Sequence, residues 1–344
     1  MVMHAPKNPR ELFDYFRLYE QPTGISGLIQ KWDASDVTPQ QVYYSVLGRL
    51  PEGDRAKRGE DYDACAQYLN ALRSDEFQSG IVKAVLNAYP DKKRMIFIHI
   101  PKCAGSHLNE KLIATFAAVN FRLMDRKWID TDNFFDMLRI LTAKLENSDT
   151  IAPYGHLPLK WYVNNGLIRL GDTTVSIVRE PAQVVLSQVN YILTRFVSDP
   201  HLKAIDTNGW LPFIDKSKLT SSIASNNFRD LAIEILYSDA LVTRDVMCSF
   251  LGHGTAKSAF ELCASASVEL TDLEHYPEWL RLRLGVDAGQ ATNVSKRYVT
   301  MEDIGIDGLE RIKNVTEQDC ILMDRVRTIM GDPNRCSISG VELL

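Results

Sequence analysis

The chain has 344 residues, 45% of them hydrophobic, which is enough for one large α/β core and a smaller module. Its formal net charge of −5 argues against general nucleic-acid binding. The first residues, MVMHAPKNPRELF, lack the apolar core of a signal peptide, and no apolar run reaches membrane-spanning length. The six cysteines are scattered without a CxxC pair, as in a reducing compartment. These features predict a cytoplasmic protein without a transmembrane segment.

Residues 1–93 are predicted to form a helical module. Helical patterns such as ELFDYFRLY at 11–19 and CAQYLNALRSDEF at 65–77 are separated by stretches rich in Pro, Gly and charge. The boundary is expected near Tyr89–Arg94, and residues 94–344 are expected to form one domain. Strand and helix patterns alternate after this boundary, which predicts an α/β fold with a mostly parallel sheet flanked by helices.

The segment MIFIHIPKCAGSHL, Met95–Leu108, predicts a strand, a tight loop and the start of a helix. Met95–Ile100 is rich in β-branched and aromatic residues, as in a buried strand, and Pro101 ends it. Gly105 has no Cβ, so an anion can approach its backbone, and Ser106 can cap the following helix. Unpaired N–H groups and the helix dipole then favour an anion in the loop.

The position of Lys102 distinguishes this loop from the nucleotide-binding loop GxxxxGK[ST]. In that loop, the Lys follows the second Gly and precedes a hydroxyl residue that holds magnesium. Here Lys102 precedes Gly105, and no Lys-Ser or Lys-Thr pair follows. The pattern predicts a phosphate or sulfate ester that is bound without a metal ion.

A second strand–loop–helix unit is predicted at 173–195. Thr173–Val178 reads as a strand with Arg179 at its carboxyl end, and Pro181 suits the first position of a helix. Ser187 lies about two turns into that helix. Ligands of open α/β sheets bind at the carboxyl ends of strands, so the two units can bind two anionic groups of one ligand.

The two segments resemble the motifs of sulfotransferases that use 3′-phosphoadenosine-5′-phosphosulfate (PAPS). IPKCAGSHL at 100–108 is similar to their 5′-phosphosulfate loop, which reads PKTAGTSL in the carbohydrate sulfotransferases. VREPAQVVLSQ at 178–188 is similar to their 3′-phosphate motif, with an Arg and a Ser eight residues later. The resemblance covers roughly Arg94 to the C-terminus and implies a P-loop-like sheet. The residues that it implies for cofactor binding are Lys102, Cys103, Ala104, Gly105, Ser106, His107, Arg179 and Ser187. Cys103 and His107 depart from the family, which usually has Thr and a second Ser or Thr there.

His156 lies between the two motifs in IAPYGHLPLKWY, where an exposed imidazole is expected on a loop at a strand end. The segment resembles a Gly-His stretch of the heparan-sulfate 2-O-sulfotransferase branch, in which a His acts as base. An acceptor hydroxyl is a poor nucleophile until a base removes its proton, and His is suited to this near neutral pH. The alternative is a His that hydrogen-bonds the loop backbone. Lys102 is expected to stabilise charge on the leaving bridging oxygen.

The resemblance implies transfer of the sulfuryl group of PAPS, without a metal, to an acceptor hydroxyl. A glycan acceptor is favoured over a lipid or a small metabolite, and nucleic acid is not expected as a partner. A bacterial or otherwise cytosolic member of the family is implied. Two alternatives stay open: a magnesium-dependent kinase of related fold, and a nucleotide-binding module without catalysis.

The C-terminal part is predicted to be mainly helical. Residues 202–251 carry helical patterns, and Leu309–Met330 is predicted as one helix followed by a polar tail. Asn293, Ser295 and Lys296 resemble a late segment that closes over the nucleotide in this family.

Overall fold

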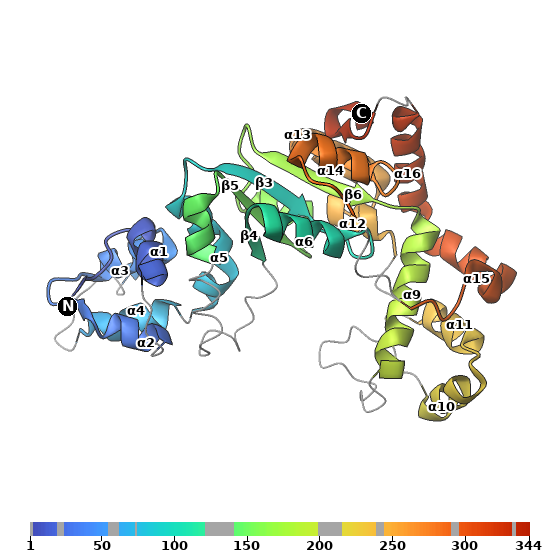
Figure 1. Cartoon of the computed structure of the whole chain (residues 1–344), viewed down its shortest axis with the longest axis horizontal. Coiled ribbons are helices and arrows are strands. Elements are labelled where there is room, and N and C mark those ends of the chain that lie inside the picture. The colour runs from blue at the N-terminus through green and yellow to red at the C-terminus, as the bar shows by residue number, and fades with distance from the viewer. Residues whose placement is uncertain are drawn as a thin grey trace. The chain divides into compact units, whose positions relative to one another are not determined.

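The computed structural model describes residues 3–18, 24–53, 62–72, 74–120, 141–198, 215–238, 244–289, 296–331 and 335–344. Six strands form a mostly parallel sheet in the order β4-β5-β3-β6-β7-β8, with helices flanking it (Figure 1). The predicted α/β class is therefore confirmed. The strands are β3 (Lys93–Ile98), β4 (Ala117–Asn120), β5 (Thr150–Gly155), β6 (Thr173–Val178), β7 (Val268–Asp272) and β8 (Ile338–Ser339).

The strand pairings show where the sheet departs from a purely parallel one. β4 and β5 are parallel, as are β6 and β7, where Thr174 pairs with Val268. β8 is antiparallel to β7, with Ile338 opposite Leu270. β8 lies in the segment that was expected to be only a polar tail. That expectation is wrong because Ile338 is buried and supplies an apolar contact at the sheet edge.

The chain divides into two compact units, Met1–Phe97 with Leu112–Gly155, and Ile98–Lys111 with His156–Leu344. The boundary expected between residues 93 and 94 stays a prediction. The first unit also has a short parallel strand pair, and its helices enclose an aromatic core in which Phe13 packs against Phe16 and Tyr89 at centroid distances of 5.7 and 6.4 Å. Its further elements are β1 (Met3–His4), α1 (Pro9–Leu18), α2 (Gly24–Ile29), β2 (Trp32–Asp33), α3 (Pro39–Leu47), α4 (Ala64–Leu72) and α5 (Asp75–Ala88).

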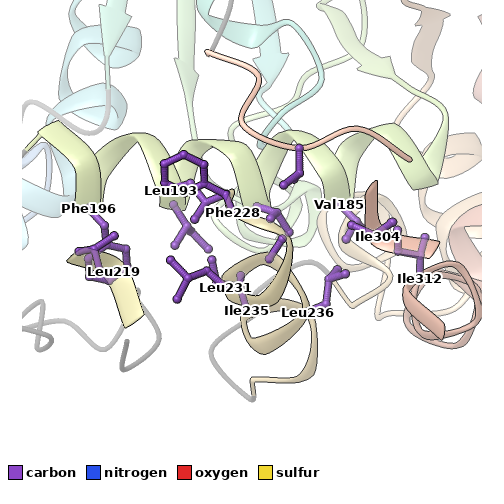
Figure 2. Packing of buried hydrophobic residues seen from close by; sticks show 14 of the residues in the cluster. Val185, Leu193, Phe196, Leu219, Phe228, Leu231, Ile235, Leu236, Ile304 and Ile312 are labelled. Carbon is purple, nitrogen blue, oxygen red and sulfur yellow. The ribbon is translucent and has the colours of Figure 1, made fainter. Parts of the chain in front are cut away.

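In the second unit, one face of a long helix, α9 (Pro181–Ser198), is covered by other helices. Figure 2 shows Val185 and Leu193 of α9 in an apolar cluster with Leu231 and Ile304 from two of those helices. This packing leaves the polar face of α9 for other contacts. The remaining helices are α6 (Gly105–Thr115), α8 (Leu159–Asn164), α10 (Lys216–Ser225), α11 (Arg229–Tyr237), α12 (Val246–Leu251), α13 (Ala256–Ser265), α14 (Tyr276–Leu284), α15 (Met301–Val315), α16 (Glu317–Met330) and a 3₁₀ turn (Gly340–Leu343). No helix in the described ranges is long and apolar enough to cross a membrane.

The helix predicted over Leu309–Met330 is in fact two helices that meet at Thr316, which has φ −130° and ψ 22°. The Asp245 carboxylate accepts the N–H groups of Gln318 and Asp319, and so it caps the first turn of α16. A cap supplied from a residue more than 70 positions away leaves no local signal in the sequence, which explains the wrong prediction.

Candidate functional site

The loop between β3 and α6 contains two non-glycine residues in the left-handed region. Lys102 has φ 67° and Ala104 has φ 58°, conformations that are uncommon for residues with a Cβ. Left-handed residues in a turn direct neighbouring N–H groups toward one side, as in anion-binding nests. Such backbone strain concentrates at ligand-binding sites, and this loop is the first phosphate loop predicted from the sequence.

α6 begins at Gly105, so Ser106 lies in its first turn and is not the predicted cap. The first N–H groups of a helix have no intrahelical acceptor. No described residue accepts a hydrogen bond from the N–H groups of Ala104, Gly105 or Ser106. These three groups, at the positive end of an 11-residue helix, are suited to bind an anion.

Cys103 is placed in the core rather than in the loop opening. Its side chain is 1% exposed, and burial raises the pKa of its thiol. Its N–H donates to the carbonyl of Ile100 at 3.3 Å, which closes the turn. Cys103 therefore anchors the loop to the core. Its thiol lacks the lowered pKa that is typical of a nucleophilic cysteine.

His107 also points away from the N–H groups of the loop. Its ring is 8% exposed, and its Nδ1 lies 3.3 Å from the hydroxyl of Tyr276 at the start of α14. Its Nε2 is buried without a hydrogen-bond partner among the described residues. Its backbone N–H donates to the Ala104 carbonyl at 3.0 Å. Burial and the charge of Glu110 raise the pKa of Tyr276.

The two predicted anion-binding segments are brought together by Arg179, which directly follows β6. Its Nη1 donates to the carbonyl oxygen of Lys102 at 3.0 Å, across 77 residues of sequence. After β3 the chain proceeds to β4 on one side of the sheet, whereas after β6 it proceeds to β7 on the other. The carboxyl ends of β3 and β6 thus form the topological switch point, where ligands of open α/β sheets bind.

The cations Lys102 and Arg179 form no ion pair with a carboxylate in the described part of the chain. Burial and Arg179 lower the pKa of Lys102 to about 8, and its Nζ lies 3.8 Å from the ring centroid of Tyr191. Burial and Arg297 lower the pKa of Arg179, and no described Asp or Glu contributes to either shift. The neighbouring Glu180 forms an ion pair with Arg327 instead. An anionic ligand would therefore supply the missing counter-charge.

The polar face of α9 runs beside this group of cations. The side-chain oxygen of Gln183 accepts from Nη2 of Arg179 at 3.2 Å, and Tyr191 contacts Lys102 two turns later. Ser187 lies midway between them, because residues four apart share one face of a helix. The predicted pair Arg179 and Ser187 is therefore on one side of the site.

Asn190 on α9 anchors a segment that carries a further cation. Its amide oxygen accepts the N–H groups of Tyr298 and Val299 at 2.6 and 3.1 Å, and its Nδ2 donates to the Val299 carbonyl at 3.0 Å. This anchoring keeps Arg297 near enough to affect the pKa of Arg179. Neither Asn190 nor Arg297 was predicted from the sequence, although an Asn among the apolar residues of α9 was a detectable signal.

The late segment proposed to close over a nucleotide is only partly described. Asn293 and Ser295 lie outside the described residues. Lys296 is exposed, and its Nζ lies 4.9 Å from the ring centroid of Tyr298.

His156 directly follows β5, as predicted, but it is half-buried rather than exposed. Its Nδ1 lies 3.2 Å from the carbonyl oxygen of His99. A carbonyl only accepts, so Nδ1 carries the proton, and the lone pair of the neutral ring is on Nε2. This tautomer is the one that a general base acting through Nε2 needs.

His99, which the sequence analysis did not assign to the site, connects His156 to the loop. The two imidazoles are stacked with centroids 4.0 Å apart and planes inclined by 32°. A Cβ on Gly105 would lie 1.8 Å from Cδ2 and Nε2 of His99. The missing Cβ of Gly105 thus makes room for this imidazole, whereas the sequence analysis assigned that room to an anion.

No group of three or more His, Cys, Asp and Glu that could hold a metal ion occurs within the described part of the chain. Comparison of the chain with protein-family models, curated proteins and solved structures found no match.

Proposed function

We propose that the protein is a sulfotransferase with a P-loop-like fold that transfers the sulfuryl group of PAPS to an acceptor hydroxyl. The observation that carries the proposal is the hydrogen bond from Arg179 to the Lys102 carbonyl. It brings together two segments that resemble, independently, the two phosphate motifs of that family. They meet at the switch point of a mostly parallel sheet, the usual ligand position in such sheets.

The arrangement suits a donor with two separated anionic groups. The N–H groups of Ala104, Gly105 and Ser106 would receive the 5′-phosphosulfate. Arg179, with Ser187 beside it on α9, would bind the 3′-phosphate, and Arg297 adds positive charge nearby. Lys102 and Arg179 are half-buried cations, and binding of a polyanion would supply the counter-charge that they lack among the described residues.

We assign His156 the role of general base. Its Nε2 would take the proton of the acceptor hydroxyl while the hydroxyl oxygen forms a bond to sulfur. The bond between sulfur and the bridging oxygen breaks, and its electron pair stays on the 5′-phosphate of the product nucleotide. Lys102 would stabilise the charge that develops on that oxygen, after it leaves the ring of Tyr191. The proton on His156 then passes to water.

The acceptor class that we favour is a glycan, with a lipid or a small metabolite behind it. We assign the first 93 residues to a helical module and residues 94–344 to the transferase domain. A cytoplasmic location and the lack of a metal requirement belong to the same proposal.

Two measurements test this function. Calorimetry in EDTA should show binding of 3′-phosphoadenosine-5′-phosphate, with weaker binding of ATP. Incubation with ³⁵S-labelled PAPS and a panel of glycans, lipids and small alcohols should label one acceptor class. Equal affinity for ATP, or binding that disappears in EDTA, would instead indicate the kinase alternative. Tight nucleotide binding without transfer to any acceptor would indicate a binding module.

A further inference from the structure

We propose that His99 is a positioning residue for His156, holding the imidazole of His156 in the orientation that its Nε2 needs to act as base. The inference builds on the proposed sulfotransferase function. Two contacts to His156 support it: the His99 carbonyl accepts from Nδ1 at 3.2 Å, and the His99 ring lies 4.0 Å from the His156 ring. The first contact, made by the backbone, selects the tautomer whatever the side chain at residue 99 is, and the second, made by the His99 ring, restricts the ring plane.

His99 can position another ring because its own ring is held from two sides. It is 6% exposed, and the backbone of Gly105 lies against its Cδ2 and Nε2 edge. On the other edge, Nδ2 of Asn109 lies 3.3 Å from its Nδ1. Gly105 and Asn109 both belong to α6, the helix whose first N–H groups are assigned to the donor. The buried imidazole of His99 therefore contacts both His156 and the first turns of α6.

The stacked geometry has a consequence for the charged form of His156. When Nε2 takes a proton, the ring becomes a cation that faces an aromatic π system, a favourable arrangement. A base whose ring plane is fixed also loses less rate to misalignment, since an error of about 1 Å can cost about a hundredfold. His99 thus acts on turnover through His156, without contact to the donor.

The test compares three substitutions in the full-length chain. His99→Ala removes the stacked ring, His99→Phe keeps an aromatic ring, and Asn109→Ala removes the polar contact to the ring but leaves His99 in place. His253→Ala, at an exposed histidine before α13, is the matched control. Turnover, donor affinity, and the ¹⁵N spectra of the imidazoles are measured for each.

We expect His99→Ala to lower kcat about tenfold to a hundredfold while the Kd for 3′-phosphoadenosine-5′-phosphate changes less than threefold. His99→Phe should recover most of that loss, Asn109→Ala should cause a smaller loss, and His253→Ala should have no effect. In the spectra, His156 should be mainly the Nδ1–H tautomer in both the wild type and His99→Ala, because the backbone carbonyl of residue 99 remains. Its imidazole signals should broaden in His99→Ala, because the ring can then adopt other orientations.

Two outcomes would overturn the proposal: unchanged kcat and unchanged His156 imidazole signals in His99→Ala, or an equal loss of nucleotide affinity and turnover, which would indicate that His99 supports the loop. The ¹⁵N measurement needs no acceptor. If the wild type transfers the sulfuryl group to no acceptor but the His156 imidazole signals still broaden in His99→Ala, the positioning role holds while the proposed function fails. If the His99→Ala variant does not fold, kcat and the imidazole spectra of Asn109→Ala test the proposal instead.

Discussion

The imidazole of His99 occupies the space that a side chain at Gly105 would need, with 1.8 Å between an ideal Cβ and both Cδ2 and Nε2 of the ring. Real Cβ atoms do not approach other atoms so closely, so any residue but glycine must displace the ring. A side chain at residue 105 would therefore move the His99 ring, and with it the surface on which the His156 ring stacks.

Gly105→Ala should therefore destabilise the protein by about 1–3 kcal/mol, the usual cost of overpacking. The cost should largely disappear in a His99→Ala background, where the ring is absent. Urea denaturation of the four proteins of this double-mutant cycle measures the coupling. Gly331→Ala is the control, because its Cβ would meet only ordinary contacts at 3.5 Å or more and its backbone is helical. If the losses of stability in Gly105→Ala and His99→Ala simply add in the double variant, the two side-chain positions are not in contact.

Arg179→Ala should weaken binding of 3′-phosphoadenosine-5′-phosphate about tenfold or more, since a hydrogen bond to a charged group contributes about 1.5–3 kcal/mol. Ser187→Ala should cost less because its hydroxyl is neutral. Calorimetry at fixed ionic strength provides the affinities, and Lys257→Ala, an exposed lysine on α13, is the charge-matched control. If Arg179→Ala binds the nucleotide as tightly as the wild type does, Arg179 does not bind the 3′-phosphate.

Lys102 should make nucleotide affinity depend on pH. Because burial and Arg179 lower its pKa to about 8, Lys102 is mostly protonated at pH 7 and mostly neutral at pH 9 in the ligand-free protein. A bound anion favours the protonated form, so affinity should fall as pH rises through about 8. Lys102→Ala should remove this dependence, with an affinity near that of the wild type at high pH, and should lower turnover more than affinity. A pH profile of affinity that is the same in the wild type and the variant would show that another group is responsible.

His156→Ala should reduce turnover by roughly 10²–10⁴-fold, the usual contribution of a positioned base, while nucleotide affinity stays nearly unchanged. The wild-type rate should rise with pH as the imidazole loses its proton. Steady-state kinetics with the acceptor found above, together with calorimetry, separate the two effects. If the variant keeps more than about a third of the wild-type turnover, His107 is the next candidate. Loss of nucleotide binding as well would make His156 structural.

Asn190→Ala should lower both stability and nucleotide affinity. It leaves the N–H groups of Tyr298 and Val299 without their acceptor and releases the segment that carries Arg297. A buried polar group without a partner costs about 1–3 kcal/mol, which thermal unfolding can detect. Thr194→Ala, on the same helix and with its hydroxyl donating to the Asn190 carbonyl, is the control. An unchanged affinity would show that Arg297 does not contribute to binding.

Local sequence patterns determined the elements that carry the site. The β-branched run TTVSIV coincides with β6, and Pro181 begins α9 as predicted, because strand propensity and the fixed φ of proline act within a few residues. The strand at 95–100 was displaced by two residues from β3, since its charged start, Lys93 and Arg94, is completed by pairing with neighbours that a local pattern does not contain. The loop and Arg179 were likewise found from the ends of these strands.

Tertiary structure decided which of these residues lie together. Strand order placed Arg179 against the Lys102 carbonyl, and packing brought Arg297 near Arg179 through a single buried amide. It also turned Cys103 and His107 into the interior and put His99 between Gly105 and His156. Contacts of this kind depend on neighbours tens to hundreds of residues away. Their energies arise only when burial removes water from both partners, so no local pattern of residue types encodes them.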